Sequence, residues 1–180
     1  MAHADTVLLD LEDPAGSTGT PISLPFVANS TLTKITFEGY QVPATLSVND
    51  ISLALTGGGP ELLGMTWAFT PAPHGSGALQ GPVGAFGVND LRFFGVVEDS
   101  FDLFSQTAPT IVGDSYTLSF TFANSPANQP SELIVMASSA TPASTPVPST
   151  AVMSCILLGM FGAVWSFRSF RWPKRTPAVH

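Results

Sequence analysis

Three carboxylates lie close together in the sequence, at Glu98, Asp99 and Asp102. Glycoside hydrolysis needs two carboxylates facing each other across a cleft, whereas these three fall within what reads as a single hairpin turn. Hard oxygen ligands on an irregular turn suit calcium better. The spacing therefore makes Glu98, Asp99 and Asp102 a candidate calcium site, and a solvated acidic turn is the alternative.

The sequence lacks the residues that acyl-transfer catalysis and a zinc site require. Away from the chain ends the only histidine is His74, in Pro73-His74-Gly75, and no Gly-x-Ser-x-Gly motif occurs. Acyl-transfer catalysis needs a nucleophile beside a base, and zinc needs several Cys or His ligands. The only cysteine is Cys155. We therefore expect neither an enzyme nor a cofactor, calcium excepted.

Two residue pairs are candidates for ligand binding. Trp67 and Phe69 have the same parity along an expected strand, so that an exposed pair would stack on a sugar ring; a position in the core is the alternative. Asn49 and Asp50 carry oxygens for a metal or for sugar hydroxyls. Such a pair can instead stabilise its own bend through hydrogen bonds to the backbone.

Short strands must position these side chains. Apolar alternation with Gly, Pro and Asn turns every ten residues or so predicts antiparallel strands. In residues 45–55 the apolar positions change parity at Asn49-Asp50, as a β-bulge or sharp bend would require. Residues 70–89, rich in Gly and Pro, predict a long loop. The strands are expected at residues 6–10, 22–26, 31–38, 45–55, 62–69, 90–97, 101–106, 114–122 and 132–137.

The fold class that follows is all-β. About nine short strands, with no amphipathic helix before Ala151, predict an antiparallel β-sandwich of the jelly-roll type over residues 5–140. The chain has 13 acidic and 6 basic residues. Only Lys34 and Arg92 are basic before the C-terminal region, which argues against nucleic acid as a partner.

The C-terminal region predicts a membrane anchor. Residues 151–167 are seventeen uncharged, mostly apolar residues, about 25 Å of helix against a hydrocarbon core of about 30 Å; a buried core helix is the alternative. Four basic residues follow in the segment 168–180, which the positive-inside rule keeps in the cytoplasm, so that residues 1–150 lie outside. These four are Arg168, Arg171, Lys174 and Arg175.

Segments on both sides of the domain fit export. Residues 141–150, TPASTPVPST, predict an extended Pro/Ser/Thr linker. Residues 1–4 end in Ala2-His3-Ala4, the small-x-small pattern at the end of a signal peptide. We interpret residues 1–4 as the remnant of such a peptide.

The order of linker, span and basic end resembles the PEP-CTERM sorting signal of Gram-negative bacteria that make extracellular polysaccharide. The corresponding motif is Pro146, Val147, Pro148, Ser149 and Thr150, with valine where that family most often has glutamate. The resemblance implies an exported precursor in the inner membrane, cleaved by an exosortase and then placed at the cell surface or in the extracellular matrix of a biofilm. A plain C-terminal anchor that is never cleaved is the alternative.

A second resemblance concerns the domain. Residues 100–125 and 35–55 look like the two signature segments of galactose-binding-like and carbohydrate-binding-type sandwich domains, in reversed order along the chain. This resemblance implies adhesion or weak binding of extracellular polysaccharide. The alternative is a structural surface protein without a small ligand.

Overall fold

A computed structural model describes residues 5–74, 79–80, 90–94, 97–125 and 130–141. Within these ranges the chain forms ten strands and no helix, and so no described helix is long and apolar enough to cross a membrane. The predicted signal-peptide remnant, sorting motif, membrane span and basic tail all lie outside the described residues.

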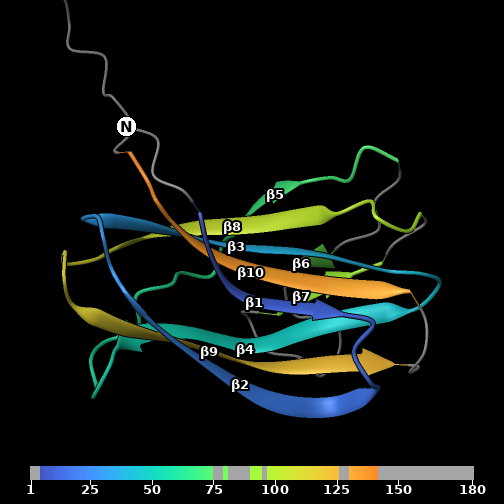
Figure 1. Cartoon of the computed structure of the whole chain (residues 1–180), viewed down its shortest axis with the longest axis horizontal. Coiled ribbons are helices and arrows are strands. Elements are labelled where there is room, and N and C mark those ends of the chain that lie inside the picture. Colours follow the sequence, from blue (N-terminus) through green and yellow to red (C-terminus); the bar gives the residue numbers. More distant parts are fainter. Residues whose placement is uncertain (1–4, 75–78, 81–89, 95–96, 126–129, 142–180) are drawn as a thin grey trace, which may run out of the picture. The chain divides into compact units, whose positions relative to one another are not determined.

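The strands form two antiparallel sheets, which confirms the predicted all-β class (Figure 1). Sheet A has the order β1 (Thr6–Glu12), β10 (Ser131–Ser139), β3 (Leu32–Gln41), β8 (Asp102–Pro109) and β5 (Ala68–Thr70). Sheet B has the order β2 (Ser17–Val27), β9 (Ser115–Ser125), β4 (Thr45–Leu55), β7 (Leu91–Phe93) and β6 (Leu79–Gln80).

The strands pair from the two ends of the domain inward. β1 pairs with β10, β2 with β9, β3 with β8 and β4 with β7. Along the chain, β1 to β4 alternate between sheet A and sheet B, and so do β8 to β10. Each sheet therefore combines strands that are distant in sequence, and its central pairings close long stretches of chain.

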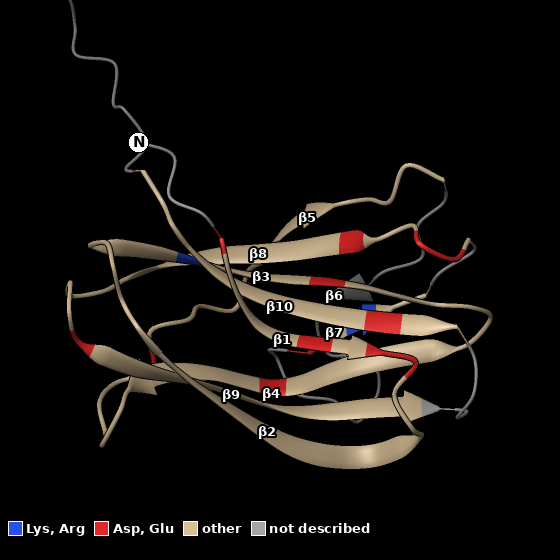
Figure 2. Ribbon diagram, viewed as in Figure 1, with Lys and Arg blue, Asp and Glu red and all other residues tan. Residues whose placement is uncertain are grey.

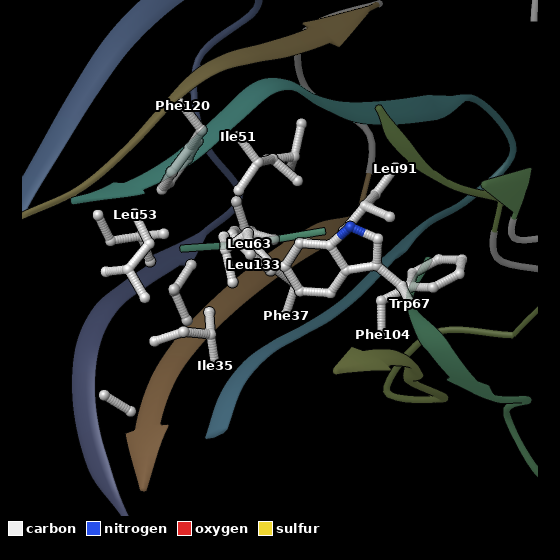
Figure 3. Close-up of a cluster of buried hydrophobic side chains, with 14 of the residues drawn as sticks. Ile35, Phe37, Ile51, Leu53, Leu63, Trp67, Leu91, Phe104, Phe120 and Leu133 are labelled. Carbon is white, nitrogen blue, oxygen red and sulfur yellow. The ribbon is translucent and has the colours of Figure 1, made fainter. Parts of the chain in front are cut away.

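Alternation along each strand places apolar side chains between the sheets. In β10, Leu133 and Val135 are fully buried, whereas Glu132 and Ile134 on the other face are only partly so. Ring contacts then join the two layers: Phe37 of β3 meets Phe120 of β9 with centroids 5.4 Å apart, and Phe104 of β8 meets Phe93 of β7 at 5.5 Å. Figure 3 shows this cluster, whose edge-to-face pairs add to the free energy gained by burial.

Eight of the nine predicted strands have a counterpart in the described sheets; β4 has the predicted ends, and the other seven differ by one to five residues at one or both ends. The irregularity predicted at Asn49-Asp50 is confirmed, because the register of β4 against β9 shifts between Asn49 and Ser52. The predicted loop contains β6 at Leu79–Gln80, and most of its other residues lie outside the described ranges.

The strand predicted over residues 62–69 is wrong for most of its length, because only Ala68–Thr70 pairs in a sheet. Side chains bind the backbone groups that a neighbouring strand would otherwise bind. Glu61 accepts hydrogen bonds from the N–H groups of Leu53 (2.9 Å) and Leu63 (2.8 Å). Gln106 accepts from the Gly64 N–H (2.7 Å) and donates to the Thr66 carbonyl (2.5 Å). Apolar alternation alone does not reveal such bonds.

Candidate functional site

The irregularity in β4 exposes Asp50 on the outer face of sheet B. Its φ is 54°, a left-handed conformation that aspartate tolerates better than most residues. The Asp50 N–H donates to Oδ1 of Asp90 (3.2 Å), whose side chain is buried. The bend is thus held by the carboxylate of Asp90, which directly precedes β7. The side chain of Asp50 itself is exposed at the surface.

Asp50 lines a shallow groove of about 310 Å³ between β2, β4 and β9. Its carboxylate accepts hydrogen bonds, and the hydroxyls of Ser23, Ser119 and Thr121 both donate and accept. No basic residue lines the groove, so that it offers an anionic group hydroxyl donors but no positive charge. The lining consists of Pro21, Ile22, Ser23, Asp50, Ser119, Phe120 and Thr121.

The structure separates the two members of the Asn49–Asp50 pair. Asp50 lines the groove, whereas Asn49 is not part of its lining. Oδ1 of Asn49 is buried and accepts no hydrogen bond from the described residues. Asp50 is therefore the member of the pair that a ligand in this groove would meet.

The aromatic pair is also divided. Trp67 is only 4% exposed and packs edge-to-face on Phe37, with ring centroids 5.5 Å apart (Figure 3). Phe69 is 43% exposed at the edge of sheet A, where its ring lies 4.9 Å from that of Phe104. An exposed Trp67–Phe69 platform is therefore not present, because Trp67 occupies the core position that the sequence left as the alternative.

The three candidate calcium ligands differ in their surroundings. Asp102 is buried, and its Oδ1 accepts from the Ala72 N–H (2.9 Å). Asp99, at φ 58°, accepts from the Tyr40 hydroxyl (3.3 Å), and Glu98 is exposed. Among the described residues no three acidic, His or Cys side chains are grouped as metal ligands. Calcium binding at this turn stays a prediction.

Acidic residues of sheet A gather toward one end of the sheet (Figure 2). Glu132 lies directly opposite Glu12 on β1 and beside Tyr40 on β3. Burial, followed by the charges of Asp10 and Glu12, raises the pKa of Glu132. Burial, followed by the charge of Asp99, raises the pKa of Tyr40 to about 12. We call this region, with Glu12, Glu98, Asp99 and Glu132, the acidic end.

A buried polar cluster near the acidic end was missed from the sequence. Asn124 of β9 accepts a hydrogen bond from Nε2 of Gln41 in β3 and donates to the Pro14 carbonyl (2.9 Å). The Ser131 N–H donates to Asp13 Oδ1 (3.0 Å). Gln41, Asn124 and Ser131 are at most 1% exposed, so this cluster joins the two sheets. In the sequence, Asn124 directly follows the apolar run of β9 and precedes Ser125 and Pro126, a pattern typical of a turn.

His74, the histidine considered for catalysis and for zinc, lies at the surface in a turn. Comparisons with protein-family models, with curated proteins and with solved structures found no match to this chain.

Proposed function

We propose that this chain is an exported, non-enzymatic protein of the cell surface or extracellular matrix, whose sandwich domain serves adhesion or weak carbohydrate binding. The observation that carries the binding part is the groove of sheet B, where Asp50 and three hydroxyls face one shallow surface. Sugars are recognised through their many hydroxyls, and carboxylates are strong acceptors for them. A shallow, open groove fits weak rather than tight binding.

The strand order supports the jelly-roll form of the sandwich. Pairing of β1 with β10, β2 with β9, β3 with β8 and β4 with β7 winds the chain from both ends toward its middle. Lectin domains are among the proteins that use jelly rolls. Because fold alone does not fix function, the argument for a glycan ligand depends on the groove.

The tail supports the export part of the proposal. Its linker, apolar stretch and basic end follow one another as in PEP-CTERM proteins of Gram-negative bacteria. In this proposal an exosortase cleaves the inner-membrane precursor near Pro146-Val147-Pro148, and the domain then reaches the surface or the polysaccharide matrix of a biofilm.

The binding part is tested by titrating the full chain with purified extracellular polysaccharide of its host. Asp50→Asn keeps a side chain that tolerates the left-handed conformation but removes the charge. Hydrogen bonds to charged groups contribute about 1.5 to 3 kcal/mol, so affinity should fall about tenfold or more. Asp114→Asn, a change outside the groove, is the matched control. Equal affinities of the Asp50 variant and the parent protein would contradict the site.

A second candidate function is a structural surface protein without a small ligand, held by an uncleaved anchor. It is favoured by the lack of a stacking surface among the described residues that line the groove, because the aromatic residue in that lining, Phe120, is only 3% exposed. Absence of saturable binding to any polysaccharide of the host would favour this second function.

A further inference from the structure

We propose that the end of the sandwich opposite the acidic end docks on the surface of the lipid bilayer that carries the predicted C-terminal span. This inference rests on the proposed membrane anchor and concerns the chain while that anchor is in place, before any cleavage by an exosortase. It goes beyond the anchor, because an anchor alone leaves the orientation of the domain free. We call this region the apolar end. It is defined by four exposed aliphatic side chains, Val27 (62% exposed), Leu55 (38%), Ile111 (64%) and Val112 (58%).

Hydrogen bonds bring these side chains together from two strand ends and one turn. The Ala28 N–H donates to the Asp114 carbonyl (3.0 Å), and the Gly113 N–H donates to the Ala28 carbonyl (2.8 Å). The Thr56 N–H donates to the Ser115 carbonyl (2.8 Å). The end of β2, the end of β4 and the turn before β9 therefore lie side by side.

An apolar groove of about 250 Å³ continues this surface. Its walls come from the end of β4, the segment after it, and the β8–β9 turn, where the Ile111 N–H is held by the Tyr116 hydroxyl (2.9 Å). Single exposed apolar residues are ordinary on protein surfaces, whereas a contiguous apolar region marks a contact. The groove is lined by Leu55, Pro60, Leu62, Pro109, Thr110, Ile111 and Tyr116.

The chain leaves the domain beside this apolar end. The Ala140 N–H donates to the Leu32 carbonyl (2.9 Å), and Leu32 pairs with Pro109. The Thr110 N–H donates to the Thr31 carbonyl (3.0 Å), directly before Ile111. Ten linker residues then precede the predicted span, and at ~3.1 Å per residue in polyproline form they reach only about 30 Å. The point of attachment is therefore on the same end of the domain as the exposed aliphatic side chains, which favours docking by that end.

The charge distribution fits the same orientation. Glu12, Glu98, Asp99 and Glu132 lie at the far end of sheet A, away from an anionic lipid surface that would repel them. The charged residues beside the apolar end include Lys34, Asp114 and Glu61, and the Glu61 carboxylate is held by the N–H groups of Leu53 and Leu63. A second copy of the chain is a poorer occupant, because four aliphatic side chains fall well short of the roughly 800 Å² per partner of a standard interface.

The test uses the full chain in phosphatidylethanolamine–phosphatidylglycerol vesicles that contain a doxyl-labelled lipid as quencher. In a Cys155→Ser background, an environment-sensitive fluorophore is attached to Val112→Cys. Val97→Cys is the matched control, since Val97 is an exposed valine (43%) beside the acidic turn. The label at position 112 should be blue-shifted and should lose most of its emission to the lipid quencher, while the label at position 97 keeps its emission.

A third labelled protein addresses the role of the patch. With the fluorophore on Val27→Cys, the double change Ile111→Asp and Val112→Asp should abolish quenching. Both positions are exposed, so we expect little effect on stability. Equal quenching at positions 112 and 97, or lipid-independent disulfide dimers formed by the unlabelled Val112→Cys protein, would overturn the docking.

An alkaline carbonate wash separates the proposed anchor from the proposed docking. Release of the protein would contradict the anchor itself, whereas retained protein without quenching at position 112 would contradict docking alone.

Discussion

Asn124 is a buried polar residue, 1% exposed, whose amide bonds to more than one segment of the domain. Its amide links Gln41 of sheet A to the Pro14 carbonyl within a region that excludes solvent. Asn124→Ala removes one hydrogen bond from each of these groups, and we expect the free energy of unfolding to fall by about 2 kcal/mol. Chemical denaturation measures this difference.

An exposed hydrogen bond provides the control. Asn29 accepts from the Ser139 hydroxyl (2.6 Å) at the surface, where water replaces a lost partner. Asn29→Ala should therefore cost less than about 0.5 kcal/mol. Equal losses for Asn124→Ala and Asn29→Ala would mean that the buried cluster does not hold the two sheets together.

The raised pKa of Tyr40 leads us to expect that the free energy of unfolding falls at alkaline pH. Its pKa is raised to about 12 in the folded protein from an ordinary value of 10.0. The native state therefore keeps a proton that the unfolded state releases, and the contribution of Tyr40 is complete below pH 10 and is lost as pH rises toward about 12. Denaturation curves at a series of pH values should show this fall. Tyr40→Phe should lack it, and identical pH profiles for both proteins would contradict the shift.

At the residue scale, the sequence predicted where a structural irregularity lies better than it predicted which contacts the residues there make. The change of parity at Asn49-Asp50 correctly marked a break in β4, because two-residue alternation is a local property. That the bend depends on Asp90, forty residues away, could not be predicted, since this contact exists only after β7 pairs with β4. For the same reason, sequence could not decide whether Trp67 is buried or exposed.

At the scale of the single element, β4 is the strand whose geometry the groove depends on. Asp50 has a φ of 54°, which glycine adopts freely and a β-branched residue does not. We expect Asp50→Gly to leave stability nearly unchanged and Asp50→Val to cost about 1 to 2 kcal/mol, measured by thermal and chemical unfolding. Comparable stability of the glycine and valine variants would show that β4 can pair with β9 without this conformation.

Strands were predicted correctly where a segment with alternating apolar residues also pairs with neighbouring strands. β9 and β10 have alternating apolar residues along most of their length, and both pair on two sides. The prediction failed at residues 62–69, where Leu63 and Trp67 are buried without belonging to a strand. Burial of apolar residues needs only a fixed backbone, and here Glu61 and Gln106 fix it through side-chain hydrogen bonds.

At the scale of the whole molecule, the all-β class followed from composition and turn spacing, whereas the assignment of strands to sheets did not. Contacts between the first and last strands close a loop of more than a hundred residues, and no local pattern encodes such a pairing. The acidic end and the apolar end also arise only when these distant strands meet. Function therefore has to be tested on the assembled domain and its tail together.

The intact mass of the mature protein, purified from its host with and without the exosortase gene, tests the central claim most directly. We expect a mass that lacks the residues after about Ser149 when the enzyme is present, and the full C-terminal region when it is deleted. That result would support a sorted surface domain. The same uncut mass in both strains would contradict the sorting proposal and leave a domain held by a plain C-terminal anchor.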